Sequence, residues 1–195
     1  MLSLKNSLAV LRKTDALLDG HFVLSSGLHS PSYVQCAKLL SFPNKSEKFT
    51  RSLANKIKKK FKNIDLILSP AMGGIVIGYE VGRVLKKETI FCERVNVTFK
   101  LRRGFKKKKK SRVLIIEDVI TTGKSSLECV KLIKKANAKL LGFASIIDRS
   151  SKKTLKIKTK NVSHLKIDVP VYSSKKLPET LKSMPITRPG SRFSK

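Results

Sequence analysis

The chain opens with apolar residues at helical spacing and continues into a segment rich in turn-forming residues. The helical positions are Leu4, Leu8, Leu11 and Leu18, and Gly20 ends the pattern. We therefore predict a helix over residues 4–18. Residues 20–35 carry many Gly, Ser and Pro residues around short extended pieces. This composition predicts strands and turns outside the main layer of the fold.

Farther along, helical patterns alternate with short apolar runs. We predict helices over residues 46–61, 75–85 and 125–138, and strands over 64–68, 89–92, 113–119, 140–147 and 165–169. Short apolar runs without alternation are typical of strands buried on both faces, as in parallel sheets. A strand, a helix and a strand within about thirty residues form a βαβ unit. The pattern predicts an α/β fold with a central parallel sheet, flanking helices and a small N-terminal hood.

The segments between these elements are predicted to be turns and loops of a single domain. A glycine-rich turn is expected at residues 70–74, a polar and basic loop at 96–110, and an irregular lysine-rich tail from residue 152. A chain of 195 residues fits one domain. We divide it into a helix and hood over about residues 1–40, a core over 41–170 and a tail over 171–195.

Composition favours a soluble, cytoplasmic protein. No apolar run approaches the ~20 residues that span a bilayer, and the N-terminus lacks the pattern of a secretory peptide. Three widely spaced cysteines, Cys36, Cys92 and Cys129, suit neither a disulfide framework nor a metal cluster, so we interpret them as core residues. His21, His29 and His164 have no metal-binding spacing, and we expect no metal ligand from the protein.

The charge is unusual, because 43 basic residues against 13 acidic ones give a formal net charge of +30. Such an excess suggests nucleic acid as a partner. However, the lysine runs are spread along the chain, at residues 56–60, 106–110, 152–160 and 175–176. Arginines with interleaved aromatic residues would indicate base recognition better. We favour a solvated, lysine-rich surface and keep a nucleic-acid partner as an open alternative.

Residues 113–126 carry the chemistry. Four apolar residues form a strand that ends at Glu117 and Asp118, where open α/β sheets bind ligands. Two adjacent carboxylates can accept hydrogen bonds from the vicinal hydroxyls of a sugar. The small residues of 121–125 then lead into a helix, so their N–H groups and hydroxyls can bind a phosphate. A Walker P-loop is excluded because Asp118 stands where its first glycine is required.

This string resembles the 5-phosphoribosyl 1-diphosphate (PRPP) signature of the type I phosphoribosyltransferases. Three other stretches are similar to orotate phosphoribosyltransferases: residues 20–33, residues 69–75, and Asp148-Arg149 after the next strand. The C-terminal Pro189-Gly190-Ser191-Arg192 resembles a bacterial and archaeal subgroup with a short loop. The resemblance implies the type I phosphoribosyltransferase fold and transfer of a phosphoribosyl group from PRPP to orotate, a step of pyrimidine biosynthesis.

The resemblance also implies roles for individual residues. The residues that bind PRPP would be Glu117, Asp118, Val119, Ile120, Thr121, Thr122, Gly123, Lys124 and Ser125, together with Met72 and Gly73 of the second loop. Arg149 would bind the orotate carboxylate, with Thr121 close to the base, and Phe22, Ser26 and Tyr33 as a roof. A salt bridge from Arg149 to Asp148 remains the alternative.

Catalysis in the family implies Mg²⁺, held mainly by the diphosphate and water. Arg94 and Lys100 of the basic loop are the candidate catalytic residues, with Arg102 and Arg103 beside them. The family's loop closes over the partner subunit, which implies a homodimer. Here the loop is short and has no histidine, and Gly73 stands where some relatives have a lysine. Two rivals stay open: a purine-base phosphoribosyltransferase, and a nucleic-acid-binding regulator built on the same fold.

Overall fold

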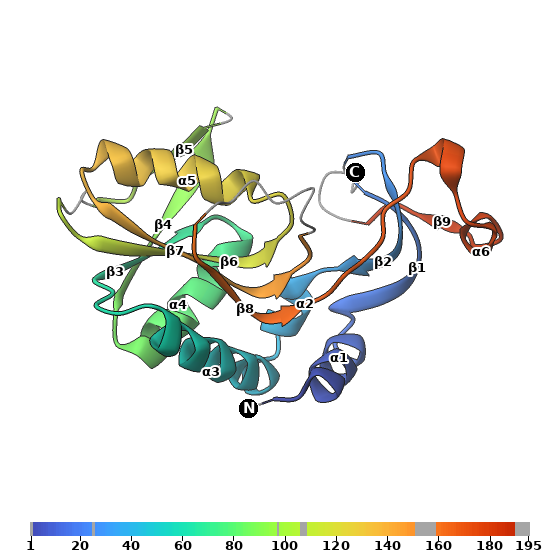
Figure 1. Ribbon diagram of the computed structural model, residues 1–195, viewed down its shortest axis with the longest axis horizontal. Helices are drawn as coiled ribbons and strands as arrows, with labels where there is room; N and C mark the ends of the chain where they lie inside the picture. Colours follow the sequence, from blue (N-terminus) through green and yellow to red (C-terminus); the bar gives the residue numbers. More distant parts are fainter. Residues whose placement is uncertain (1, 25, 97, 106–108, 151–158, 190–195) are drawn as a thin grey trace.

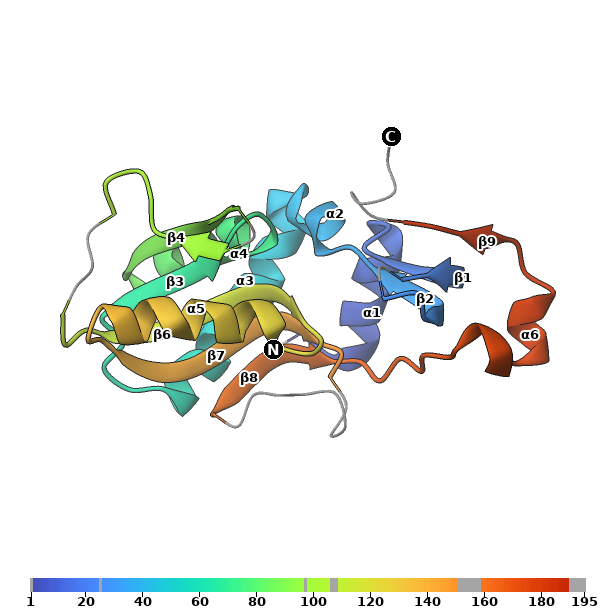
Figure 2. The same cartoon turned by 90° about the horizontal axis from the view of Figure 1, so that it is seen from above.

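The computed structural model has a helix-covered sheet on one side and a smaller hood on the other (Figures 1 and 2). It describes residues 2–24, 26–96, 98–105, 109–150 and 159–189. Residues 106–108, most of the lysine run 152–160 and the C-terminal residues 190–192 lie outside this part of the chain. Within it, no helix is both long enough and apolar enough to cross a membrane.

The core is a six-stranded sheet in the order β5-β4-β3-β6-β7-β8. Five of its strands are parallel: β3 (Leu66–Pro70), β4 (Glu88–Val95), β6 (Arg112–Ile120), β7 (Lys139–Asp148) and β8 (Asn161–Lys166). The short β5 (Thr98–Lys100) pairs antiparallel with β4 at the edge. The predicted central parallel sheet is confirmed, and the carboxyl ends of its strands meet at one edge.

Helices cover both faces of this sheet, which explains the uninterrupted apolar runs of its strands. In Figure 1, α3 (Pro43–Lys60) and α4 (Gly73–Leu85) lie on one face, and α5 (Lys124–Lys135) lies on the other. Alternate residues of β6 enter different clusters: Leu114 packs with Phe49 and Leu53 of α3, whereas Ile115 packs with the cluster that contains Cys129 of α5. Burial on both faces fixes the strand between its helices.

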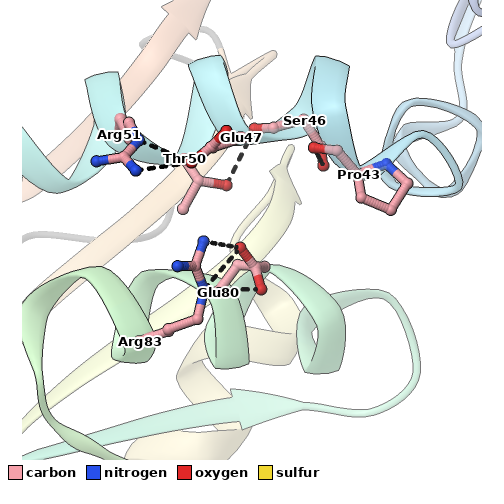
Figure 3. A network of polar contacts seen from close by, with 7 residues as sticks. All are labelled: Pro43, Ser46, Glu47, Thr50, Arg51, Glu80 and Arg83. Atoms are coloured by element: carbon pink, nitrogen blue, oxygen red, sulfur yellow. Dashed lines mark hydrogen bonds and ion pairs between the residues drawn. The ribbon is translucent and has the colours of Figure 1, made fainter.

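Polar contacts accompany the packing of α3 and α4, as Figure 3 shows. The Arg51 guanidinium donates to Glu47 within α3, with the shorter contact at 2.7 Å. Within α4, Arg83 donates to Glu80, and this bond raises the pKa of Arg83, with a further contribution from the charge of Glu47 on the neighbouring helix. These pairs are exposed, so each contributes little to stability.

The hood is a second, three-stranded sheet in the order β2-β1-β9. It is built from β1 (Leu17–Val23), its antiparallel partner β2 (His29–Val34) and the parallel β9 (Ile186–Thr187), and it is joined to the core by α2 (Cys36–Leu40). The preceding α1 (Leu4–Lys13) is tied to β8 by a 2.9 Å hydrogen bond between Ser7 Oγ and His164 Nε2. Within the hood, His21 Nε2 and His29 Nδ1 lie 2.6 Å apart.

Two predictions about the ends of the chain are wrong. The helix predicted over residues 4–18 ends at Lys13, because Thr14 caps it and Asp15 adopts a positive φ of 53°. Leu18 fits the helical spacing but belongs to β1. The tail is also more regular than expected: it contains a 3-10 turn (Ser174–Lys176), α6 (Glu179–Lys182) and β9. The tail lacks a clear apolar period, so tertiary pairing with β1 defines its strand.

Two predictions nearer the centre also need correction. The polar loop at 96–110 contains β5, where Phe99 is buried between exposed Thr98 and Lys100. The two acids do not end β6, because the strand continues to Ile120 and pairs there with β7 at Ile147 and Asp148.

Candidate functional site

Glu117 and Asp118 lie near the carboxyl end of β6, and they extend to opposite faces of the sheet because side chains alternate along a strand. Glu117 is 8% exposed and accepts a short hydrogen bond from the Ser126 hydroxyl in the first turn of α5. Burial raises its pKa to about 7, and the negative charge of Asp118 adds to the effect, while the Ser126 hydrogen bond opposes it. Glu117 is therefore poised to change its charge near neutral pH.

Asp118 faces the start of α4 on the other side of the strand. A Cβ atom added to Gly73 would lie 2.6 Å from the Asp118 carboxylate oxygen Oδ2, so only glycine fits against this side chain without movement. The other oxygen, Oδ1, accepts the N–H of Val119 at 2.9 Å. Burial raises the pKa of Asp118, and the hydrogen bond from Val119 opposes the rise. The glycine that replaces the expected lysine thus has a steric reason in this chain.

Residues 121–125 form the turn between β6 and α5. Thr121, Thr122 and Lys124 are exposed, whereas Gly123 is buried at the N-cap of α5 with a φ of 74° that favours glycine. The Lys124 N–H donates to Thr122 Oγ1 at 3.3 Å, and α5 starts at Lys124. The helix α5 has twelve residues, and the free N–H groups of its first turn point toward this turn. Such an arrangement favours an anion.

The second loop approaches β6 from the side of α4. Gly74 comes so close that an added Cβ atom would lie 3.0 Å from the Ile116 carbonyl oxygen. Met72, just before the helix, is 81% exposed. The loop thereby places Gly73 beside the carboxylate of Asp118.

Arg149 follows β7 and reaches the same edge, where its N–H donates to the Ile120 carbonyl oxygen at 2.8 Å. Its side-chain Nε is buried and has no hydrogen-bond partner among the described residues. Burial lowers the pKa of Arg149, and nearby Tyr33 of the hood opposes that effect. Asp148 instead accepts hydrogen bonds from the Ser150 N–H at 2.8 Å and the Asn161 amide at 3.3 Å. The alternative salt bridge between Arg149 and Asp148 does not occur among the described residues.

Tyr33 links the hood to this edge of the core. Its pKa is raised by burial, lowered by the charge of Arg149 and raised by the charge of Asp118, so all three side chains share one electrostatic environment. The Phe22 ring lies 5.8 Å from the Tyr33 ring, centre to centre. Phe22 itself is buried, and Ser26 is exposed on the turn of the hairpin.

The basic residues of β4, β5 and the following turn are mostly held by acids. Arg94 Nη1 lies 2.8 Å from Glu128 Oε2 on α5, and its guanidinium stacks over the Phe99 ring at 4.2 Å. Arg102 and Arg103 both pair with Glu93 of β4. Lys100 is exposed on the edge strand β5. Arg94 points to the α5 side of the sheet, whereas Lys100, which pairs in register with Glu93, points to the opposite face. The charge of Arg94 opposes the effect of burial on the pKa of Glu117, so Arg94 is electrostatically coupled to the site.

Comparison with known proteins identifies the group to which the chain belongs. A model of the phosphoribosyl transferase domain matches residues 38–173. A curated orotate phosphoribosyltransferase from Parvibaculum lavamentivorans is 46% identical over 181 residues, covering 92% of this chain and 93% of the relative. The chain belongs to the orotate phosphoribosyltransferase family. The crystal structure of orotate phosphoribosyltransferase from Aeropyrum pernix has a TM-score of 0.71 at 22% identity, covering 82% of this chain and 92% of that one.

The fold extends beyond that family. Adenine phosphoribosyltransferase from Thermoanaerobacter pseudethanolicus has a TM-score of 0.59 at 14% identity, covering 70% of this chain and 88% of that one. The fold alone therefore does not identify the base.

Sequence reasoning missed Ser126 as a partner of the acid pair. Its hydroxyl contacts Glu117 because the first turn of α5 folds back over β6. A serine in the first helical turn after the strand that carries the two acids was a usable signal, since that turn faces the preceding strand. The contact makes Ser126 a positioning residue for Glu117 in this member of the family.

Proposed function

We propose that this enzyme transfers the 5-phosphoribosyl group of PRPP to orotate and releases diphosphate. In the reaction, an ionised ring nitrogen of orotate forms the new bond to C1′ of ribose. The bond from C1′ to the diphosphate oxygen breaks, and its electron pair leaves with the diphosphate. The proton of that ring nitrogen passes to solvent when the nitrogen ionises, before the bond to C1′ forms, so no protein group has to remove it during the transfer.

The donor half of the site would bind PRPP through two sets of groups. Glu117 and Asp118 would accept hydrogen bonds from the ribose hydroxyls. The 5′-phosphate would bind at the turn from Thr121 to Ser125, where N–H groups and the start of α5 favour an anion. Val119 and Ile120 supply the backbone between the two halves. Because binding of the diol requires acceptors, ionised Glu117 should bind PRPP more tightly than its protonated form.

The leaving diphosphate needs compensation of its negative charge. Mg²⁺ bound to PRPP would supply this positive charge. A carboxylate oxygen of Asp118, beside the Gly73 turn, could contact such an ion. The protein's own contribution would come from Met72 and Gly73, and from Arg94 and Lys100 as candidate catalytic residues.

The unpartnered Nε of Arg149 is the observation that carries the choice of orotate. A buried guanidinium N–H without an acceptor is costly, and a carboxylate that accepts it would remove that cost. Tyr33 shares the same environment from the hood side. Orotate carries a carboxylate, whereas purine bases do not. Arg149 therefore favours orotate over the purine alternative.

The decisive experiment follows orotate consumption with PRPP and Mg²⁺. We expect turnover by the wild type, a large loss with Asp118→Asn, and a Michaelis constant for orotate raised roughly 100-fold by Arg149→Ala, because a charge-assisted pair is worth about 2–3 kcal/mol. Arg51→Ala, which removes an exposed arginine of α3, serves as the control and should behave as wild type. Turnover of adenine, guanine or hypoxanthine without orotate would contradict the proposal.

A homodimer is part of the proposal. Met72, Val76 and Tyr79 lie at helical spacing along α4 and are 81%, 48% and 64% exposed. An apolar stripe of this kind beside the site suits a second copy of the chain. We expect Val76→Glu to shift the molar mass in light scattering from dimer to monomer, while Val171→Glu, on the exposed tail, should not. A monomeric wild type would refute it.

We also assign the enzyme to the cytoplasm. The three cysteines are free and buried, as predicted for core residues, and free thiols persist in a reducing compartment.

A further inference from the structure

Lysines from four separate segments meet at the amino edge of the core sheet, opposite Glu117 and Asp118. They precede β3 at positions 58–60 and 62, β4 at 86–87, β6 at 109–110 and β7 at 134 and 135, and Lys139 is the first residue of β7. All eleven are exposed. In Figure 1, α3, α4 and α5 end on the side away from the hood, where these strands begin. We name this surface the lysine edge.

Backbone hydrogen bonds join the four segments into one surface. The Asp65 N–H donates to the Arg112 carbonyl at 2.9 Å, and the Lys139 N–H donates to the Ser111 carbonyl at 2.8 Å. The Lys110 N–H donates to the Asn137 carbonyl at 3.0 Å. On the other side, β3 and β4 start in register at Leu66 and Glu88. Runs that are far apart in the sequence therefore become neighbours through the parallel topology.

Negative charge does little to offset the lysine edge. In the segments 58–65, 86–88, 109–112 and 134–139 the acids are Asp65 and Glu88. Asp65 is bound to Arg112, whose guanidinium and N–H hold the pKa of that carboxyl well below its usual range. The remaining eleven acids of the chain lie in other segments. The lysine edge thus carries eleven lysines and Arg112 against these two acids.

Helix capping explains only part of this charge. Lysines at 58–60 and 134–135 occupy the last turns of α3 and α5, where cations interact favourably with the helix dipole. Lys62 also donates to the Lys58 carbonyl oxygen of the last turn of α3 at 3.4 Å, and Lys86 is the C-cap of α4. The lysines at 87, 109, 110 and 139 lie beyond the helices and have no such reason. Crowded like charges destabilise a folded chain by mutual repulsion. A partner with closely spaced negative charges would remove that repulsion.

We propose that the lysine edge binds the phosphate backbone of nucleic acid, without sequence preference and without occluding the active site. Nucleic acid offers one phosphate charge about every 1.7 Å along a duplex, which matches a dense, exposed lysine surface. The four lysine segments carry no exposed large hydrophobic side chain among the residues that the structure describes, and the exposed Tyr79 borders only Lys86 and Lys87. The edge therefore offers few of the anchors of a protein interface or a membrane-inserting surface. Lysine is also depleted from protein interfaces.

The test measures fluorescence anisotropy of a labelled, mixed-sequence DNA duplex of about 30 base pairs with the full-length protein. If about five phosphates are neutralised, raising KCl from about 50 to about 200 mM should weaken binding roughly 500-fold. Phosphatidylserine vesicles and polyglutamate are the competitors. They should displace the duplex only weakly. Binding that ignores salt, or a preference for vesicles or polyglutamate over the duplex, would overturn the proposal.

Two variants with the same net charge locate the surface. The edge variant carries Lys59→Gln, Lys87→Gln, Lys110→Gln and Lys135→Gln, one change per segment. The control carries Lys5→Gln, Lys13→Gln, Lys175→Gln and Lys176→Gln, all exposed and on the hood side of the molecule. The slope of the logarithm of the binding constant against the logarithm of the KCl concentration should become less steep. We expect its magnitude to fall by about four for the edge variant and by less than one for the control. If both variants lost the same amount of DNA affinity, net charge alone would explain the binding, and the lysine edge would be refuted as the site. Thermal unfolding of both variants checks that they are folded.

Discussion

The raised pKa of Glu117 predicts that ionisation of this side chain destabilises the folded protein, although the ionised form is the one expected to bind PRPP. An ordinary glutamate has a pKa of 4.5, but burial raises that of Glu117 to about 7 in the folded protein. Below pH 4.5 the group is protonated in both states. Between these values the folded state binds more protons than the unfolded state, so stability falls as pH rises and levels off above about 7.

The magnitude follows from the same two values. Moving a pKa from 4.5 to about 7 corresponds to about 3 kcal/mol of destabilisation once the carboxylate is ionised. Glu117→Gln removes the charge and keeps an oxygen that accepts the Ser126 hydroxyl. We therefore predict that the variant matches wild type near pH 4.5 and exceeds it by ~3 kcal/mol at pH 8.

The assay is urea denaturation of the protein without substrates at several pH values between these limits. In parallel, kcat/KM for PRPP should rise with pH through about 7 in the wild type, because the ionised form accepts the ribose hydroxyls. Asp65→Asn is the control: its pKa is lowered by Arg112, so its stability effect should stay constant over this range. A stability difference between Glu117→Gln and wild type that does not vary with pH would refute the reasoning.

Two further predictions concern Gly73 and the cysteines. Gly73→Ala should raise the Michaelis constant for PRPP about tenfold by displacing Asp118, and a double-mutant cycle with Asp118→Asn should show strong coupling; independent effects would exclude the contact as the cause. The native protein should react only slowly with thiol reagents, since Cys36, Cys92 and Cys129 are buried. Burial raises the pKa of Cys36, and the hydrogen bond with Cys92 together with burial raises the pKa of Cys129. Denaturation should release all three thiols, and rapid labelling of the native protein would contradict their burial.

The sequence predicted those parts of the fold that depend on local pattern. The apolar runs at β3, β6 and β7 and the periodic helix α3 were identified, because burial on two faces or one stripe leaves a direct imprint on composition. Leu18 was misassigned because its spacing fits a helix that Asp15 in fact ends. Short elements such as β5 and β9 leave no such imprint, since pairing with a neighbouring strand defines them.

The candidate site divides in the same way. Glu117, Asp118 and the turn after them are adjacent in the chain, so their proximity could be predicted from one string. Arg149 and Tyr33 are separated by more than a hundred residues, and their common environment depends on how the hood docks. The close approach of Gly73 to Asp118 was likewise invisible, because it depends on the angle at which α4 meets the sheet.

The pairing of β9 with β1 has a consequence for anyone who shortens or extends the chain. His21 and Phe22 lie opposite Ile186 and Thr187, so a segment near the end of the sequence supplies the outer strand of the hood. Removing it would leave the backbone N–H and C=O groups of β1 unpaired at an open edge, a known route to intermolecular strand addition. Aggregation of a truncated chain would then result from the loss of the strand that pairs with β1. It would not mean that Glu117, Asp118 or the turn at residues 121–125 had been damaged.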